Sequence, residues 1–249
     1  MERELLIFDN IDEVMNHAAL KWIETETAIL REKSVFMAAL SGGKTLVPFL
    51  QKLATSEVSW NATHLFQADE RYVPPGHADN NFRMIRENLI DRIDIPDENV
   101  HPVATDAASV QAAAALYELT IRQCFRSFGA SVPEFDLIIL GIGEDGHTAS
   151  LFPGDPAVKE GTRLVASVIL NDADKHDRVT LTLPILNHAK NIIFLLTGKE
   201  KASILEKIWE NPGTSFPAAM VRPLHGRLCF LADTKAGAEV KRSTPGMMI

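Results

Sequence analysis

Short, continuously apolar segments alternate along this chain with segments of helical periodicity, and this alternation restricts the fold more than any other feature. The apolar runs are VFMAAL (35–40), THLFQA (63–68), DLIIL (136–140) and NIIFLLTG (191–198, a strand and then a turn). Strands that are apolar on both faces and are connected by helices form mostly parallel sheets covered on both sides. The sequence therefore predicts a three-layer, doubly wound α/β fold with a mostly parallel, Rossmann-like sheet.

The chain is predicted to be one domain, 1–249, because no Pro-, Gly- or Ser-rich linker divides it. A chain of this length buries roughly three-quarters of its unfolded surface and needs no disulfide or metal to fold. The first buried strand is expected at residue 35, after one helix capped by Asn10 with Glu13. A short helix is expected after the last strand, RLCFLAD (227–233).

Composition excludes several classes of protein. The net charge of -8 argues against nucleic-acid binding, which normally requires a basic surface. The first residues, MERELLIFDN, do not resemble a signal peptide, and no apolar run approaches the ~18 residues of a membrane span. Cys124 and Cys229 lie in apolar contexts and are expected to be buried, reduced thiols. We expect a cytoplasmic protein that is a monomer or a weak homo-oligomer.

Four unusual loops each follow an apolar strand directly: SGGKT, DERYVPP, GIGEDGHTAS and TGKEKA. In open α/β sheets, ligands bind at the carboxyl ends of the strands. The four loops are therefore expected to converge on one crevice. Their shared position is stronger evidence for a ligand-binding site than any single motif.

The loop GIGEDG matches the spelling of a dinucleotide-binding fingerprint, but its context does not. Pro153 and Pro156 leave room for at most two turns of helix after it, and Glu144 and Asp145 would repel a pyrophosphate. The glycines instead predict a tight turn that presents Asp145 and His147. Imidazole has an ordinary pKa near 6.5, so His147 is the candidate base. No such role is predicted for the other histidines: His17, His64, His77, His101, His176, His188 and His225.

The segment LGIGEDGHTASLFPG resembles the signature of 6-phosphogluconolactonases. ALSGGKT resembles the SGGxTP loop of that family, and DERYVPPGHADNNF resembles its DERxVPxxxxxSN segment. RVTLTLPILNHAKNIIFLLTGKEKA and FPAAMVRPLHGRLCFLAD resemble two later segments in the same order. Leu46 replaces the expected proline and Asn80 the expected serine, which puts only the local loop geometry in doubt.

The resemblance implies hydrolysis of a six-membered sugar lactone that carries a 6-phosphate, the second step of the oxidative pentose phosphate pathway. His147 is then the general base, and Asp145 orients it or shapes the turn. Arg71 meets the developing oxyanion or the product carboxylate. The substrate-binding candidates in the SGGKT loop are two glycines with free N–H groups and two hydroxyl residues: Ser41, Gly42, Gly43 and Thr45.

The phosphate requires cations. Lys201 matches the family's lysine in TGKEKA, and Arg222 in MVRP is the second candidate. Asp69, a predicted substrate ligand, and Glu70 bind sugar hydroxyls or hold Arg71 in place. Arg178 is either a ligand or a structural partner, and Lys44 and Lys199 are expected to be solvated. No metal motif is present, and the reaction needs no cofactor.

Three other functions fit parts of the sequence. A serine esterase would use Ser41 as nucleophile, but LSGGK is not a G-x-S-x-G elbow. A glucosamine-6-phosphate deaminase shares the DGH turn but usually continues with IAFNEP where this chain has TASLFP, and it lacks the arginine after DE. A sugar-phosphate sensor usually carries a DNA-binding module ahead of this domain, and here only one helix precedes residue 35.

Overall fold

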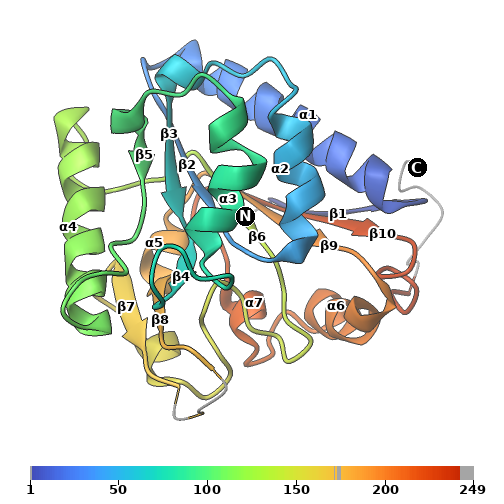
Figure 1. Cartoon of the computed structure of the whole chain (residues 1–249). Coiled ribbons are helices and arrows are strands. Elements are labelled where there is room, and N and C mark those ends of the chain that lie inside the picture. The colour runs from blue at the N-terminus through green and yellow to red at the C-terminus, as the bar shows by residue number, and fades with distance from the viewer. Residues whose placement is uncertain (1, 171, 173–174, 242–249) are drawn as a thin grey trace.

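The computed structural model describes residues 2–170, 172 and 175–241. Its centre is a seven-stranded sheet in the order β1-β10-β9-β6-β2-β3-β5, with every pair parallel (Figure 1). The strands are β1 (Glu2–Phe8), β2 (Phe36–Leu40), β3 (Thr63–Gln67), β5 (Val100–His101), β6 (Leu137–Leu140), β9 (Asn191–Leu196) and β10 (Arg227–Asp233). The predicted mostly parallel α/β sheet is confirmed.

Helices cover both faces of this sheet and complete the three layers. One apolar core contains α1 (Ile11–Leu30), α2 (Val47–Leu53) and α3 (Asn81–Asn88). The opposite core contains α4 (Val110–Ser127), α5 (Leu183–Asn187), α6 (Ala202–Glu210) and α7 (Pro217–Met220). Along β2, Phe36 and Leu40 face the first core, whereas Met37 and Ala39 face the second. This alternation explains why β2 is apolar at every position.

A second, three-stranded antiparallel sheet lies against α4. It pairs β4 (Asp69–Arg71) with β8 (Arg178–Leu181), and β8 with β7 (Val165–Val168); Figure 1 shows β7 and β8 in yellow beside α4. The DER residues were expected in a loop, but they form β4. Because Ala68 alone separates β3 from β4, the chain passes directly from the central sheet into the small one.

The ends of the chain differ from expectation in two ways. The segment at residue 35 is the first strand that is buried along its whole length, but β1, a partly buried strand at the edge of the central sheet beside β10, precedes it and was not predicted. The helix expected after the last strand is not formed within the described residues, where 234–239 are turns. Among those residues, the structure contains no helix whose length and apolarity would carry it across a bilayer. The single domain 1–249 includes undescribed residues and stays a prediction.

Helix capping and core packing account for the two departures from the family pattern. Asn80 caps α3, where its side chain accepts a hydrogen bond from Arg83 N at 2.8 Å, so asparagine serves here as serine would. Leu46 is 1% exposed and packs into the core beside α2. The cap predicted for α1 is confirmed, since Asn10 accepts from Glu13 N at 3.0 Å.

Candidate active site

Four neighbouring strands of the central sheet deliver the four unusual loops. β9, β6, β2 and β3 are consecutive and parallel, so TGKEKA, GIGEDGHTAS, SGGKT and DER all begin at the same edge. This is the carboxyl edge, where α/β sheets bind their ligands.

The turn after β6 has a glycine wherever a side chain would collide. Gly143 N donates to His147 O at 2.8 Å, and Gly146 N donates to Gly143 O at 2.9 Å. A Cβ at Gly143 would lie 2.1 Å from His147 Nδ1. Gly146 has φ 84° and lies against Phe216, so it needs both the left-handed backbone and the missing side chain. The glycines therefore allow a tight turn that leaves room for the side chains packed against it.

This turn brings Asp145 and His147 together. His147 Nδ1 lies 2.6 Å from Asp145 Oδ1, and His147 N donates to the same oxygen at 3.1 Å. Burial raises the pKa of Asp145, but the backbone N–H and imidazole of His147 outweigh it, so the pKa is lowered overall. A carboxylate at Nδ1 favours the tautomer with its proton there. Nε2 is then left to accept a proton, while the ring packs against Phe152.

A chain of buried contacts connects three of the loops. Ser150 Oγ donates to Asp69 Oδ2 at 2.8 Å, which ties the DGH loop to β4. Asn81 Nδ2 donates to Asp69 O at 3.1 Å. The Asn81 side chain also lies against Gly42, where a Cβ would come within 1.9 Å of its Oδ1. Asp69 is 7% exposed, so the structure gives it a positioning role; its role as a sugar ligand stays a prediction.

Glu70 is fully buried, and its carboxylate accepts four hydrogen bonds. Oε1 accepts from Arg71 N and Asn81 N, and Oε2 accepts from Gln67 Nε2 and Phe82 N, all at 2.7 Å. Burial raises the pKa of Glu70, and these hydrogen bonds oppose that effect. Of the two roles left open by the sequence, the contacts favour holding Arg71 and the start of α3 in place.

Arg71 has a second arginine directly opposite it. Arg71 and Arg178 are register partners in the antiparallel pair β4–β8. Their guanidinium groups donate to backbone carbonyls, Arg71 to Asp79 O at 2.9 Å and Arg178 to His176 O at 2.6 Å. Burial, and then the charge of Arg71, lowers the pKa of Arg178. Two facing guanidiniums of this kind form a natural site for an anion.

The SGGKT loop follows β2 and contains an unsatisfied hydroxyl. Ser41 is 4% exposed, and its Oγ has no hydrogen-bond partner in the part of the chain that the structure describes. Gly43 has φ 105° and precedes the short 3-10 helix Lys44–Leu46, on which Thr45 is partly buried. The Ser41 hydroxyl is therefore available to hydrogen-bond a substrate or a water molecule.

The two predicted phosphate ligands lie in different places. Lys201 ends the 3-10 helix after Gly198, at the carboxyl edge, and Asp233 accepts from Gly198 N at 3.1 Å. Arg222 is not brought to this edge. Its guanidinium donates to the carbonyls of Ala219 and Pro212, and its N–H donates to Asn187, at the end of the helix that precedes β9. It thus lies towards the amino ends of the strands.

Sequence reasoning missed the residues that position the site. It did not single out Ser150, Asn81 or Asp233, although the first two lie within the quoted motifs TAS and ADNN. Their partners are 81, 12 and 35 positions away along the chain, so no local pattern identifies the contacts.

Comparisons with known proteins agree with this architecture. The family model described as glucosamine-6-phosphate isomerases/6-phosphogluconolactonase matches residues 9–230. The chain is 38% identical over 232 residues to the 6-phosphogluconolactonase of Synechocystis sp., covering 92% of this chain and 95% of that protein. Over 206 residues it is 40% identical to the Rattus norvegicus 6-phosphogluconolactonase, covering 81% and 79%.

Solved structures give the same result. The crystal structure of 6-phosphogluconolactonase from Thermotoga maritima superposes with a TM-score of 0.82 at 34% identity and covers 93% of this chain and all of that one. A monomeric glucosamine-6-phosphate deaminase, at 21% identity and a TM-score of 0.78, shares the fold. The chain therefore belongs to the glucosamine-6-phosphate isomerase/6-phosphogluconolactonase family, as a hydrolase of the lactonase type.

Proposed function

We propose that this chain hydrolyses 6-phospho-D-glucono-1,5-lactone to 6-phospho-D-gluconate, with His147 as the general base. The observation that carries the proposal is the 2.6 Å contact between Asp145 Oδ1 and His147 Nδ1 at the carboxyl edge of the sheet. The curated relatives named 6-phosphogluconolactonase support the reaction.

In the proposed mechanism, a water oxygen attacks the lactone carbonyl carbon while its proton moves to His147 Nε2. Asp145 stabilises the imidazolium that forms, as a carboxylate does beside a catalytic histidine. When the tetrahedral intermediate collapses, the bond to the ring oxygen breaks, and the imidazolium returns its proton to that oxygen. The products are an open-chain hydroxyl and a carboxylic acid, which ionises. General base catalysis of this kind contributes about 10²–10⁴ in rate.

The substrate's negative charges require the cations at the same edge. We assign the developing oxyanion and the phosphate to Arg71, Arg178 and Lys201, which lie on β4, β8 and the loop after β9. Ser41 and the glycine N–H groups beside it supply further hydrogen bonds, because the Ser41 hydroxyl is buried without a partner in the described structure. Arg222 has no part in this assignment.

The rival functions make different demands on the same residues. A serine esterase needs a base hydrogen-bonded to its nucleophile, and no described side chain is hydrogen-bonded to Ser41 Oγ. A deaminase needs a free carboxylate in DER as an enolising base, but Glu70 is saturated by four donors and Asp69 is bonded to Ser150. The lactonase mechanism uses both carboxylates only for positioning.

The test is the initial rate of hydrolysis of freshly prepared lactone, followed through a coupled 6-phosphogluconate dehydrogenase with spontaneous hydrolysis subtracted. His147→Ala is expected to lose most turnover while it still binds 6-phosphogluconate. Rapid turnover in the variant would refute the role of His147 but keep the reaction. Ammonia release from glucosamine 6-phosphate, without lactone hydrolysis, would refute the reaction itself.

Location and oligomeric state stay predictions: a cytoplasmic monomer or weak homo-oligomer.

A further inference from the structure

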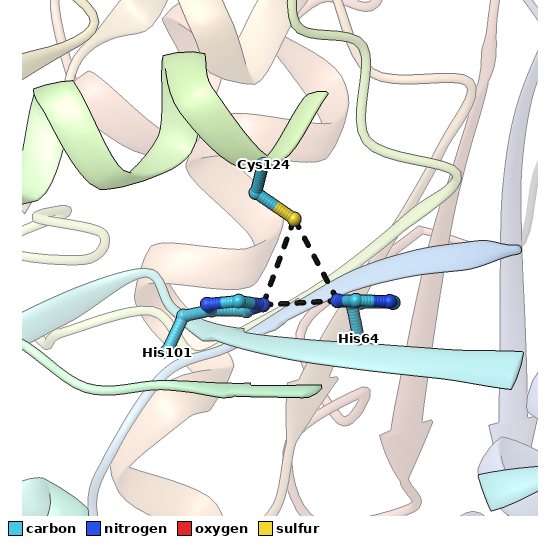
Figure 2. A group of neighbouring side chains, drawn as sticks. All are labelled: His64, His101 and Cys124. Atoms are coloured by element: carbon cyan, nitrogen blue, oxygen red, sulfur yellow. Dashed lines mark hydrogen bonds between the residues drawn. The ribbon is translucent and has the colours of Figure 1, made fainter. Parts of the chain in front are cut away.

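Two histidines and a cysteine meet at the β5 edge of the central sheet, where His101 pairs with Phe66 of β3. His64 Nδ1 lies 3.0 Å from His101 Nε2, and Cys124 Sγ lies 3.6 Å from each nitrogen. Figure 2 shows the thiol pointing from the end of α4 towards the two imidazoles, so that the three atoms form a triangle. The residues come from β3, β5 and the last turn of α4, which are far apart in sequence.

This group is distinct from the catalytic residues. His64 precedes Asp69 by five positions, which is at most about 16 Å of extended chain, and His101 pairs with Phe66, three positions before Asp69. All three side chains line a cleft of about 550 Å³, which Glu98 and Asn99 also line. The cleft gives an ion a path to the three atoms and leaves room for a water or a carboxylate as a fourth ligand.

The spacing of the three atoms fits a tetrahedral zinc ion. Zn–N bonds of about 2.0–2.1 Å and Zn–S bonds of about 2.3 Å at tetrahedral angles place two nitrogens about 3.3 Å apart and nitrogen and sulfur about 3.6 Å apart. The sulfur distances already match, and the nitrogens need to separate by about 0.3 Å. The imidazole planes lie within 8° of each other, with centroids 5.3 Å apart, so the rings meet edge to edge and each also has to turn by about 35° to direct its nitrogen at the ion.

We propose that His64, His101 and Cys124 bind one zinc ion that joins β3, β5 and the end of α4. When the ion binds, the proton shared by the two facing nitrogens moves to the other nitrogen of the ring that carried it, and the thiol proton is released. Imidazole and thiolate are the ligands that zinc prefers, and three of them leave a fourth position open.

The protonation states of the three groups suit this role. Burial lowers the pKa of His64, and burial followed by the charge of His64 lowers that of His101 to about 4, so both rings are neutral at pH 7. Neutral imidazole is the form that binds metals. Burial raises the pKa of Cys124 to about 11, so the thiol loses a proton only when the ion binds. Zinc binding at pH 7 is therefore expected to release about one proton.

The site has a structural purpose in this position. β5 is a two-residue edge strand that pairs with β3 alone, and α4 packs over both. An ion held by one ligand from each element joins an edge that few backbone hydrogen bonds secure. Because zinc binds only the folded site, it is expected to raise the Tm in proportion to the logarithm of its free concentration.

The test uses the full chain after treatment with a chelator. Zinc is titrated by calorimetry in two buffers of different ionisation enthalpy, which yields stoichiometry, affinity and proton release. Cobalt(II) then replaces zinc, and its thiolate charge-transfer band reports sulfur ligation. One equivalent, about one released proton and a thiolate band are expected. Absence of the band, or of stoichiometric binding, would overturn the proposal.

Matched variants locate the ion. Cys124→Ala and, separately, His64→Gln are expected to remove the band or weaken zinc binding on the order of 100-fold. Cys229→Ala removes the other cysteine and is expected to change neither the thiolate band nor the zinc affinity. His176→Gln disrupts the second possible ligand group, His77, Asp79 and His176, and is also expected to change neither.

A band that survives in Cys124→Ala, or binding lost only in His176→Gln, would refute the site. The rate of lactone hydrolysis in Cys124→Ala should equal that of the wild type. A failure of the zinc proposal therefore leaves the proposed function untouched, and a failure of the proposed function leaves the zinc proposal untouched.

Discussion

Replacing Gly143 by alanine is predicted to disable catalysis while leaving the fold intact. An added Cβ would lie 2.1 Å from His147 Nδ1, 2.2 Å from His147 Cε1 and 2.6 Å from Asp145 Oδ1. Gly143 is not among the glycines with positive φ, so alanine meets no backbone strain there. The whole effect therefore comes from contact with the two side chains of the proposed catalytic pair.

The size of the effect follows from these distances. Real Cβ contacts begin near 3.0 Å and become ordinary at 3.4–4 Å, so the ring nitrogen has to retreat by more than 1 Å. The carboxylate is displaced as well, which breaks the 2.6 Å hydrogen bond. Misplacement by about 1 Å costs on the order of 10² in rate, and full loss of a general base costs about 10²–10⁴. We expect kcat to fall by about 10²–10³, with a smaller change in KM, because the substrate's cations lie on other strands.

Gly141→Ala in the same loop is the matched control. A Cβ at Gly141 has no other heavy atom within 4 Å, and Gly141 also lacks a positive φ. Both variants are compared with the wild type in the coupled lactone assay, with thermal unfolding as the check on folding. If Gly143→Ala keeps its kcat within about threefold of the wild type, or if Gly141→Ala falls equally, the role given to the Asp145–His147 pair is refuted.

Further substitutions test the remaining parts of the site. Glu70→Gln offers one acceptor oxygen to four donors, so about two N–H groups lose their partner and the free energy of unfolding falls by roughly 2–4 kcal/mol in urea titrations. Glu26→Gln is the control: Oε1 accepts from both donors, Ser59 N and Thr63 Oγ1, and Oε2 only shares Ser59 N, so one amide oxygen can keep both bonds and the change should stay within about 1 kcal/mol. Burial raises the pKa of Glu26, and its hydrogen bonds oppose this effect. The folded state therefore takes up a proton at a higher pH than the unfolded state does, so the wild type should gain stability relative to Glu26→Gln as the pH falls from 7 towards 4. If the wild type gains no stability, the Glu26 carboxylate is not a buried charge. Asp145→Asn should lower kcat at least about tenfold with little change in KM, and an unchanged kcat would show that the carboxylate does not orient the base. Arg178→Gln should raise KM by about tenfold or more and lower kcat less, and an unchanged KM would leave Arg178 a structural residue.

The central fold is predictable from this sequence because buried parallel strands are short apolar runs that can be recognised directly. β2, β6 and β9 are covered on both faces, so all of their residues except Asn191 at the start of β9 are apolar, and polar loops mark their ends. β1 is harder to recognise as a strand from the sequence, because an edge strand has one neighbour and tolerates charged residues such as Arg3. β4 was taken for a loop because its three residues are the polar sequence DER, which pairs with β8 through contacts about 110 positions away.

The reacting groups of the site were predictable, whereas the residues that hold them were not. Asp145 and His147 share one turn, so local sequence places them together. The Ser150–Asp69 bond depends on how the two sheets meet, which no local pattern contains. Arg222 was predicted to bind the phosphate because it lies in the MVRP motif, but its hydrogen bonds place it towards the amino ends of the strands, so its role as a phosphate ligand stays a prediction.

The same reasoning explains why the proposed zinc ligands are invisible in the sequence and why the ion should leave catalysis unchanged. Metal motifs are read from ligands a few residues apart, but His64, His101 and Cys124 are separated by 37 and 23 positions. His64 lies near the amino end of β3, and His101 lies on β5 beside Phe66, on the side of β3 that faces away from β2. The chain that leaves the carboxyl end of β3 forms β4. β3 is buried along its whole length and paired on both sides, so it is already held in one conformation without the ion. Zinc on the β5 side can therefore stabilise the edge of the sheet, and raise the Tm, without altering the geometry of the catalytic loops.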